Sequence, residues 1–105
     1  MEQPNIKYIE DVAGSDADFK ANFIQILKME FPDEFVHYKN MYAAKNHIET
    51  AAIVHKLKHK LNIVGLQDGY RMAVTYEEEL KKGKDAMHTD FLPILEVAGA
   101  FISTL

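Results

Sequence analysis

The 105-residue chain contains no cysteine. This absence excludes disulfide bonds, thiol catalysis and cysteine-based zinc sites. The chain also lacks any apolar run near the ~18 residues that a membrane-spanning helix needs, so no membrane association is expected. Its first residues, Met1 to Asn5, lack the basic start and apolar centre of a secretion signal. We therefore expect a cytoplasmic protein.

Signatures of nucleotide chemistry are missing as well. The sequence has no glycine-rich phosphate loop and no ATP-binding motif, so we expect no kinase or other enzyme activity of its own. A net charge of −4 at pH 7 argues against nucleic acid as the main partner. The length and a hydrophobic content of 48% predict one domain over residues 1–105, with its core at about 5–105.

Apolar residues recur at helical spacing throughout the chain and no strand pattern occurs, which predicts an all-α protein. In the first half, Gly14 is expected to end a short N-terminal helix. Ser15 is predicted to cap the next helix, with an acidic residue three positions later. Pro32 is predicted to lie in the first turn of a second helix or at a kink, and the two helices are expected at about 16–30 and 33–44.

The second half shows three further helical segments. Asn46 is a predicted N-cap for a helix at 47–64, which is followed by a helix at 67–82. The C-terminal helix is predicted to begin near Thr89 or to be kinked at Pro93. Short connections between these segments predict an antiparallel four-helix bundle with an additional short N-terminal helix and a C-terminal helix.

The helix at 47–64 carries two distinct stripes of side chains. The buried stripe contains Val54, Leu57, Leu61 and Val64. The second stripe, displaced by about 100° or more, contains Ile48, Ala51, Ala52, His55, Lys58, His59 and Asn62. We therefore expect His55 to be exposed at mid-helix, with Lys58 on the same face and Leu57 and Leu61 buried.

A local positive patch surrounds His55 in an otherwise acidic protein, and it consists of Lys56, Lys58 and Lys60. Lys58 lies one turn after His55 and would favour an anionic adduct on the histidine. The other two lysines are predicted to point away and to solvate the surface. The small residues Ala51 and Ala52 would let the surface of another protein approach His55 closely.

The pattern of His55, a lysine three positions later at Lys58, and a glycine ten positions later at Gly65, all on a bundle helix, resembles the histidine-containing phosphotransfer (HPt) domain. The resemblance covers roughly residues 5–105. It implies a phosphorelay intermediate. His55 would accept a phosphoryl group from the aspartate of a receiver domain in a hybrid histidine kinase and pass it to the receiver aspartate of a response regulator.

The resemblance also implies roles for individual residues. Lys58 would neutralise the phosphoryl oxygens, and Gly65 would be structural. The residues expected to contact the partner are Ile48, Ala51, Ala52, His59 and Asn62. We expect no cofactor on this chain, because the receiver domain would supply the Mg²⁺.

One departure from the family leaves two alternatives open. Family members usually have glycine directly after the lysine, where this chain has His59. That difference is compatible with a non-catalytic module that binds a receiver without relaying phosphate. The second and less favoured alternative is a histidine-based metal-binding bundle, because His55 and His59 have the i, i+4 spacing that chelates zinc on a helix. Three lysines lie nearby and no third ligand is identified, so no residue is assigned as a metal ligand.

The remaining polar residues are predicted to lie at the surface. His37, His47 and His88 have no identifiable partners in the sequence. The acidic run of Glu77, Glu78 and Glu79, followed by lysines, is predicted to be a solvated helix end. No cluster of carboxylates that could hold a metal is expected beside His55.

Overall fold

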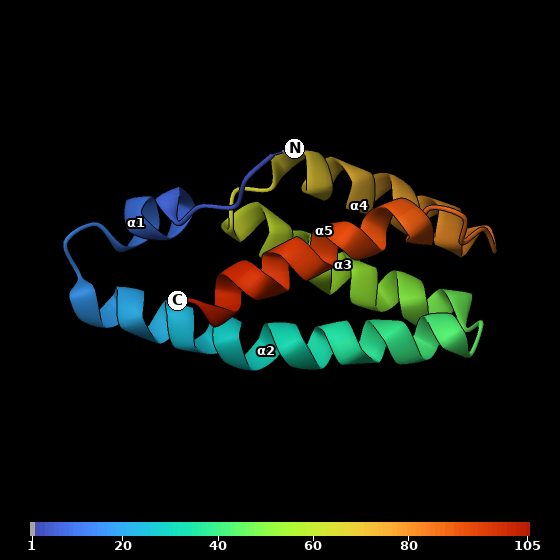
Figure 1. The fold of residues 1–105 in the computed structure, drawn as a ribbon, viewed down its shortest axis with the longest axis horizontal. Coiled ribbons are helices and arrows are strands. Elements are labelled where there is room, and N and C mark those ends of the chain that lie inside the picture. Colours follow the sequence, from blue (N-terminus) through green and yellow to red (C-terminus); the bar gives the residue numbers. More distant parts are fainter. Residues whose placement is uncertain (1) are drawn as a thin grey trace.

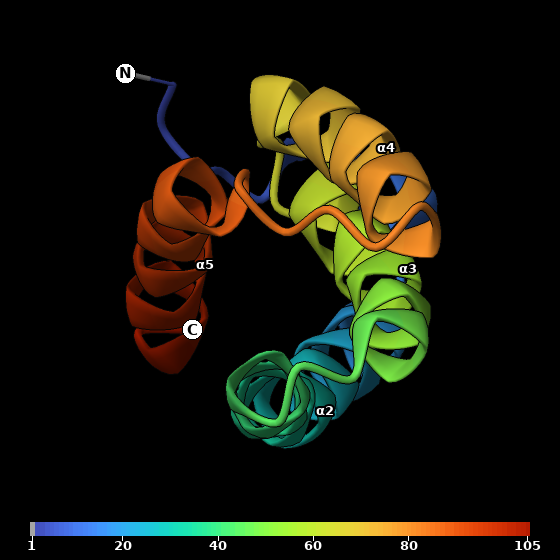
Figure 2. The same ribbon diagram turned by 90° about the vertical axis from the view of Figure 1, so that its right-hand side faces the viewer.

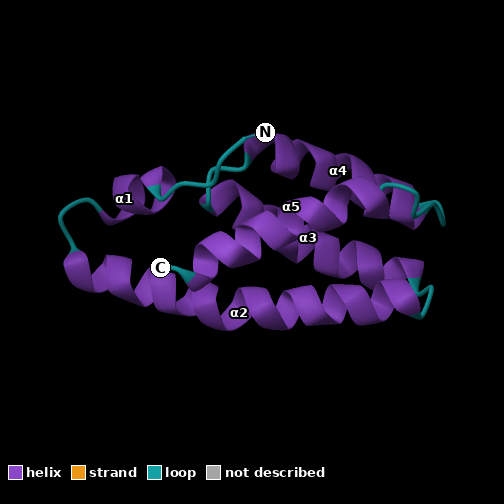
Figure 3. Cartoon of the chain, viewed as in Figure 1, coloured by secondary structure: helices purple, strands orange, loops and turns teal. Residues whose placement is uncertain are grey.

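The computed structural model describes residues 2–105, so Met1 of the predicted domain lies outside the described residues. Five helices and no strands occur in this part of the chain, which confirms the all-α prediction (Figures 1 and 3). They are α1 (Lys7–Ala13), α2 (Ala17–Ala43), α3 (His47–Ile63), α4 (Gln67–Lys81) and α5 (His88–Ser103). No helix within residues 2–105 is long and apolar enough to cross a lipid bilayer.

The helices pack side by side around one core. The α3 helix packs against both α2 and α4, α5 contacts α2 and α4, and the short α1 packs on α2. Seen along the long axis, α2 to α5 surround the interior (Figure 2). Large side chains from all four of these helices are fully buried there, among them Phe31, Tyr38, Leu57, Leu61, Tyr76, Leu80, Phe91 and Leu95.

The predicted helix break at Pro32 is wrong, because α2 is one continuous helix of 27 residues with Pro32 inside it. The proline removes one backbone hydrogen bond, at a cost of about 3 kcal/mol. Leu27, Phe31 and Tyr38 lie on both sides of it and are at most 1% exposed. Each such buried side chain stabilises the fold by about 1.5–3 kcal/mol, so their burial outweighs the lost bond. The described chain therefore has four long helices, and α5 is one of them rather than an addition.

The N-caps of the two central helices are formed by side chains just before each helix. Asp16, not Ser15, caps α2, since its carboxylate accepts a hydrogen bond from the Phe19 amide at 2.9 Å. The prediction of Ser15 was one residue early. Asn46 caps α3 as predicted, with its side-chain oxygen 3.1 Å from the Glu49 amide.

The C-terminal helix begins close to Thr89, as one of the two predicted alternatives had it. It starts at His88, one residue before Thr89, and continues through Pro93. It packs closely on α2 at Gly99, where a β-carbon would lie 3.2 Å from the ring of Phe31. This contact joins the last helix to the first long one.

Candidate functional site

His55 lies at the middle of α3 with 52% of its side chain exposed. Leu57 and Leu61 on the same helix are completely buried. The predicted exposure of His55 and burial of the leucine stripe are both confirmed. The imidazole thus lies at the surface of a rigid helix rather than on a loop.

One edge of the His55 ring faces a carboxylate from the neighbouring helix. Glu77 of α4 places both carboxylate oxygens 3.2 Å from Nδ1 of His55. An ionised carboxylate can only accept hydrogen bonds, so Nδ1 is the nitrogen that carries the proton. Nε2 therefore holds the free lone pair of the neutral ring.

Two lysines bind the same carboxylate. Lys58 Nζ lies 3.3 Å from one oxygen of Glu77, and Lys81 Nζ lies 3.3 Å from the other. Burial by itself raises the pKa of the Glu77 carboxyl, but hydrogen bonds from His55, Lys81 and Lys58 outweigh burial and hold that pKa below its usual value. The group is ionised at neutral pH, and it connects His55 to two cations.

The prediction that Glu77 belongs to a solvated helix end is wrong, since only 10% of its side chain is exposed. The sequence contains a signal for its burial. Ala73 and Leu80, four residues before and three residues after Glu77, are completely buried. That spacing places the Glu77 carboxylate on the buried stripe of α4.

A shallow hollow lies beside His55 between α3 and α4, and its lining consists of Ile48, Ala51, Ala52, His55, Lys56, Glu77 and Lys81. Ile48 is 65% exposed, and Ala52 is also exposed. Ala51 is only 3% exposed, so it shapes the floor of the hollow and offers little contact area of its own. Three of the predicted partner contacts therefore meet at one place next to the histidine.

The other two predicted partner contacts, His59 and Asn62, lie further along α3. The His59 ring meets the His55 ring edge to face, with centroids 5.1 Å apart and an angle of 83° between the planes. Asn62 lies at the end of α3, where it accepts a hydrogen bond from the Gln67 side chain at 3.0 Å. Asn62 is thus not part of the hollow beside His55.

Gly65 follows the C-cap of α3 with φ of +79°, a backbone conformation that favours glycine. A β-carbon at this position would lie 2.5 Å from the Asn5 side chain. Both observations agree with the predicted structural role. The close approach comes from the N-terminal segment rather than from another helix.

Lys60 does not solvate the surface as predicted. Its side chain is 14% exposed and its Nζ lies 3.1 Å from a Glu30 oxygen and 3.3 Å from a Glu34 oxygen on α2. Lys60 thus joins α3 to α2 on the side of the helix away from α4. Lys56, in contrast, is exposed as predicted.

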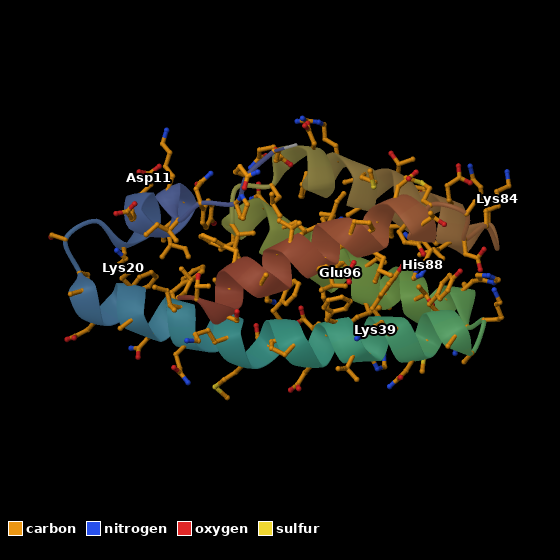
Figure 4. All side chains as sticks on the ribbon, viewed as in Figure 1. Asp11, Lys20, Lys39, Lys84, His88 and Glu96 are labelled. Carbon is orange, nitrogen blue, oxygen red and sulfur yellow. The ribbon has the colours of Figure 1, made fainter. Side chains whose placement is uncertain are left out.

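A second polar group lies away from His55 and involves histidines predicted to be free. His88 Nδ1 is 2.7 Å from the Tyr38 hydroxyl, which is also 2.8 Å from the Tyr76 hydroxyl. Burial raises the pKa of Tyr38 and raises that of Tyr76 to about 12. Figure 4 shows His88 at the start of α5, at the same end of the molecule as Lys84. His47 is not free either, because its Nε2 lies 3.3 Å from Asp85.

No cluster of three or more histidine, aspartate or glutamate side chains in residues 2–105 is arranged to hold a metal ion. His55 and His59 supply two nitrogen atoms, and one side of the His55 ring already bonds to Glu77. The chain matches no protein-family model, no curated protein and no solved structure.

Proposed function

We propose that this protein is a phosphorelay intermediate that accepts a phosphoryl group on Nε2 of His55 and passes it on. One observation carries the proposal. His55 is exposed at mid-helix while its Nδ1 is bonded to the ionised Glu77. This bond fixes the ring orientation and the tautomer, and it leaves Nε2 as the nucleophile.

The transfer step needs no general base, because Nε2 of His55 carries no proton. The Nε2 lone pair attacks the phosphorus of an aspartyl phosphate, the Nε2–P bond forms, and the P–O bond to the aspartate breaks with its electron pair on the carboxylate. The ring keeps its Nδ1 proton and becomes positively charged. The carboxylate of Glu77 at 3.2 Å stabilises that charge, and Lys58 neutralises phosphoryl oxygens.

The return step is the reverse of the first and uses the same groups. The protonated phosphohistidine is a good leaving group for attack by the aspartate of a second receiver domain. Mg²⁺ would be bound by the receiver, so this chain itself needs no cofactor for the step. The protein acts as a phosphocarrier rather than as a kinase.

The arrangement of the helices supports an HPt-like antiparallel four-helix bundle. In this proposal α2, α3, α4 and α5 form the bundle, and α1 is the additional short helix. The acceptor lies on α3 and its carboxylate partner on α4, the helix that packs most extensively against α3. The receiver domain would dock over the hollow, with the exposed Ile48 and Ala52 at its edge. A cytoplasmic location fits such partners.

The test is a phosphotransfer assay with labelled receiver domains and a matched pair of variants. His55→Gln is expected to lose all phosphate label, while helicity and thermal stability stay nearly unchanged, because glutamine suits an exposed helical position. His59→Gln is the control and is expected to keep the label. Mass spectrometry locates the phosphate, and acid lability identifies the P–N bond.

Two other outcomes distinguish the alternatives. Label that persists in His55→Gln and disappears in His59→Gln would make His59 the acceptor. Receiver binding with no label on the unchanged protein would favour the non-catalytic receiver-binding module.

A further inference from the structure

We propose that Lys81 is a second phosphoryl-binding residue beside Lys58, and that Lys81 leaves Glu77 to hold the phosphoryl group of phosphorylated His55. This inference rests on the proposed function and extends it. The sequence pattern pointed only to Lys58. The second lysine comes from a different helix, 26 positions after His55.

The contacts place the two lysines on the two oxygens of the carboxylate that faces Nδ1 of His55. Each lysine Nζ lies 3.3 Å from a different oxygen of Glu77, and both of those oxygens lie 3.2 Å from Nδ1 of His55. The carboxylate of Glu77 therefore links both ammonium groups to the His55 ring. Lys81 also lines the hollow beside His55, whereas Lys58 does not.

Exposure makes Lys81 the more mobile of the two cations. The Lys81 side chain is 52% exposed, compared with 14% for Lys58. An exposed lysine keeps several rotamers within reach and can follow a new anion into the hollow, while a mostly buried one has little room to move. The hydrogen bond to Glu77 raises the pKa of Lys81, so the group is protonated throughout the neutral range.

Electrostatic attraction to the phosphoryl group would draw Lys81 away from Glu77. In the unphosphorylated site Lys58 and Lys81 face Glu77, and Lys81 also lies 3.7 Å from the exposed Glu78. A phosphoryl group adds about two negative charges and three acceptor oxygens. It is a stronger acceptor for ammonium groups than a single carboxylate. Lys81 would therefore shift from Glu77 toward the phosphoryl group.

Lys82, the next residue after α4, offers a matched control. It carries the same charge, is exposed, and forms no ion pair with the residues that the structure describes. Replacing Lys82 removes the same unit of charge from almost the same place in the sequence. It leaves the contacts of Glu77 unchanged.

The experiment uses phosphoramidate as a small phosphoryl donor, so that no receiver domain is needed. The P–N bond of phosphoramidate breaks, ammonia leaves after gaining a proton from water, and the bond from Nε2 to phosphorus forms. Lys81→Ala is expected to slow labelling of His55 by about tenfold, as for the loss of one charge-assisted hydrogen bond. Lys81→Arg is expected to restore most of the rate, and Lys82→Ala is expected to match the unchanged protein.

A second measurement tests the contact directly. Titration of the phosphorylated protein by ³¹P NMR is expected to show a higher phosphoryl pKa in Lys81→Ala than in Lys82→Ala, because a nearby cation favours the dianion. Equal labelling rates and equal phosphoryl pKa values in these two variants would overturn the role of Lys81 while leaving the proposed function in place. A Lys81→Arg protein as slow as Lys81→Ala would also count against it. Absence of label on His55 in the unchanged protein would overturn the proposed function and this inference together.

Discussion

Two ring nitrogens of one histidine have different environments in this protein. Nδ1 of His55 faces a buried carboxylate, while the rest of the ring is exposed on α3. A solvated histidine on an ordinary helix would exchange freely between its two neutral tautomers. The contact with Glu77 selects one of them.

At the scale of the residue, we predict that Glu77 controls the tautomer of His55. Glu77→Ala removes the acceptor for the Nδ1 proton, so the tautomer with the proton on Nε2 should become populated. Glu77→Gln keeps an oxygen acceptor and should retain the original tautomer. The measurement is the pair of ¹⁵N shifts of the ring at about pH 8, above the ordinary titration range of an imidazole.

Glu78→Ala is the matched control for this prediction. Glu78 is the neighbour of Glu77, its side chain is 64% exposed, and it lies 3.7 Å from Lys81. The variant therefore removes an equal charge without touching His55. A tautomer distribution in Glu77→Ala that equals the one in Glu78→Ala would show that the carboxylate does not orient the ring.

At the scale of the element, the ends of the helices depend on single side chains. The first turn of α2 has its Phe19 amide satisfied by Asp16 at 2.9 Å, whereas Ser15 makes no capping bond. Similarly, Asn46 satisfies the Glu49 amide at the start of α3. These caps fix where each helix begins.

We predict that Asp16→Ala lowers the free energy of unfolding by about 1 kcal/mol, the usual cost of losing an N-cap. Ser15→Ala is the control and should change it by less than about 0.5 kcal/mol, as expected for a surface position without such a bond. Urea denaturation followed by circular dichroism measures both values. A larger effect for Ser15→Ala than for Asp16→Ala would show that the earlier residue is the cap.

At the scale of the whole molecule, a chain of polar contacts crosses the core near the start of α5. The hydroxyl of Tyr38 on α2 joins Tyr76 on α4 to His88 on α5. Tyr42 stacks on the His88 ring, with centroids 3.5 Å apart and planes 9° apart. Three long helices therefore meet at one hydrogen-bonded group, which links their positions.

This group predicts a pH dependence of stability. Burial lowers the pKa of His88, so the unfolded chain binds this proton at a higher pH than the folded protein does. The free energy of unfolding should fall as the pH drops below about 6.5, by at most about 1.4 kcal/mol per pH unit for this one proton. Thermal unfolding midpoints between about pH 7.5 and 5.5 measure the slope.

His88→Phe keeps an aromatic ring against Tyr42 and removes the titration, so it should flatten the slope. His37→Gln, at an exposed position on α2, should leave the slope unchanged. An unaltered slope in His88→Phe would contradict the assignment. Below the usual carboxyl range a second decline is expected, since hydrogen bonds lower the pKa of Asp85 and of Glu77.

Local sequence patterns are sufficient to predict the features that depend on neighbours along one helix. The bounds of α3 and α4, the Asn46 cap and the exposure of His55 all follow from the 3.6-residue period and from caps within one turn. These interactions join residues at most four positions apart. A periodic pattern in the sequence is therefore enough to predict these interactions.

The contacts that join different helices depend on how the helices pack in three dimensions. Pro32 lies within a continuous helix because side chains on both sides of it are buried by other helices. The partners of His55 and Lys60 are likewise on neighbouring helices, at Glu77 and Glu34. Which carboxylate faces which cation depends on the rotation and stagger of packed helices, and no local period encodes these two quantities.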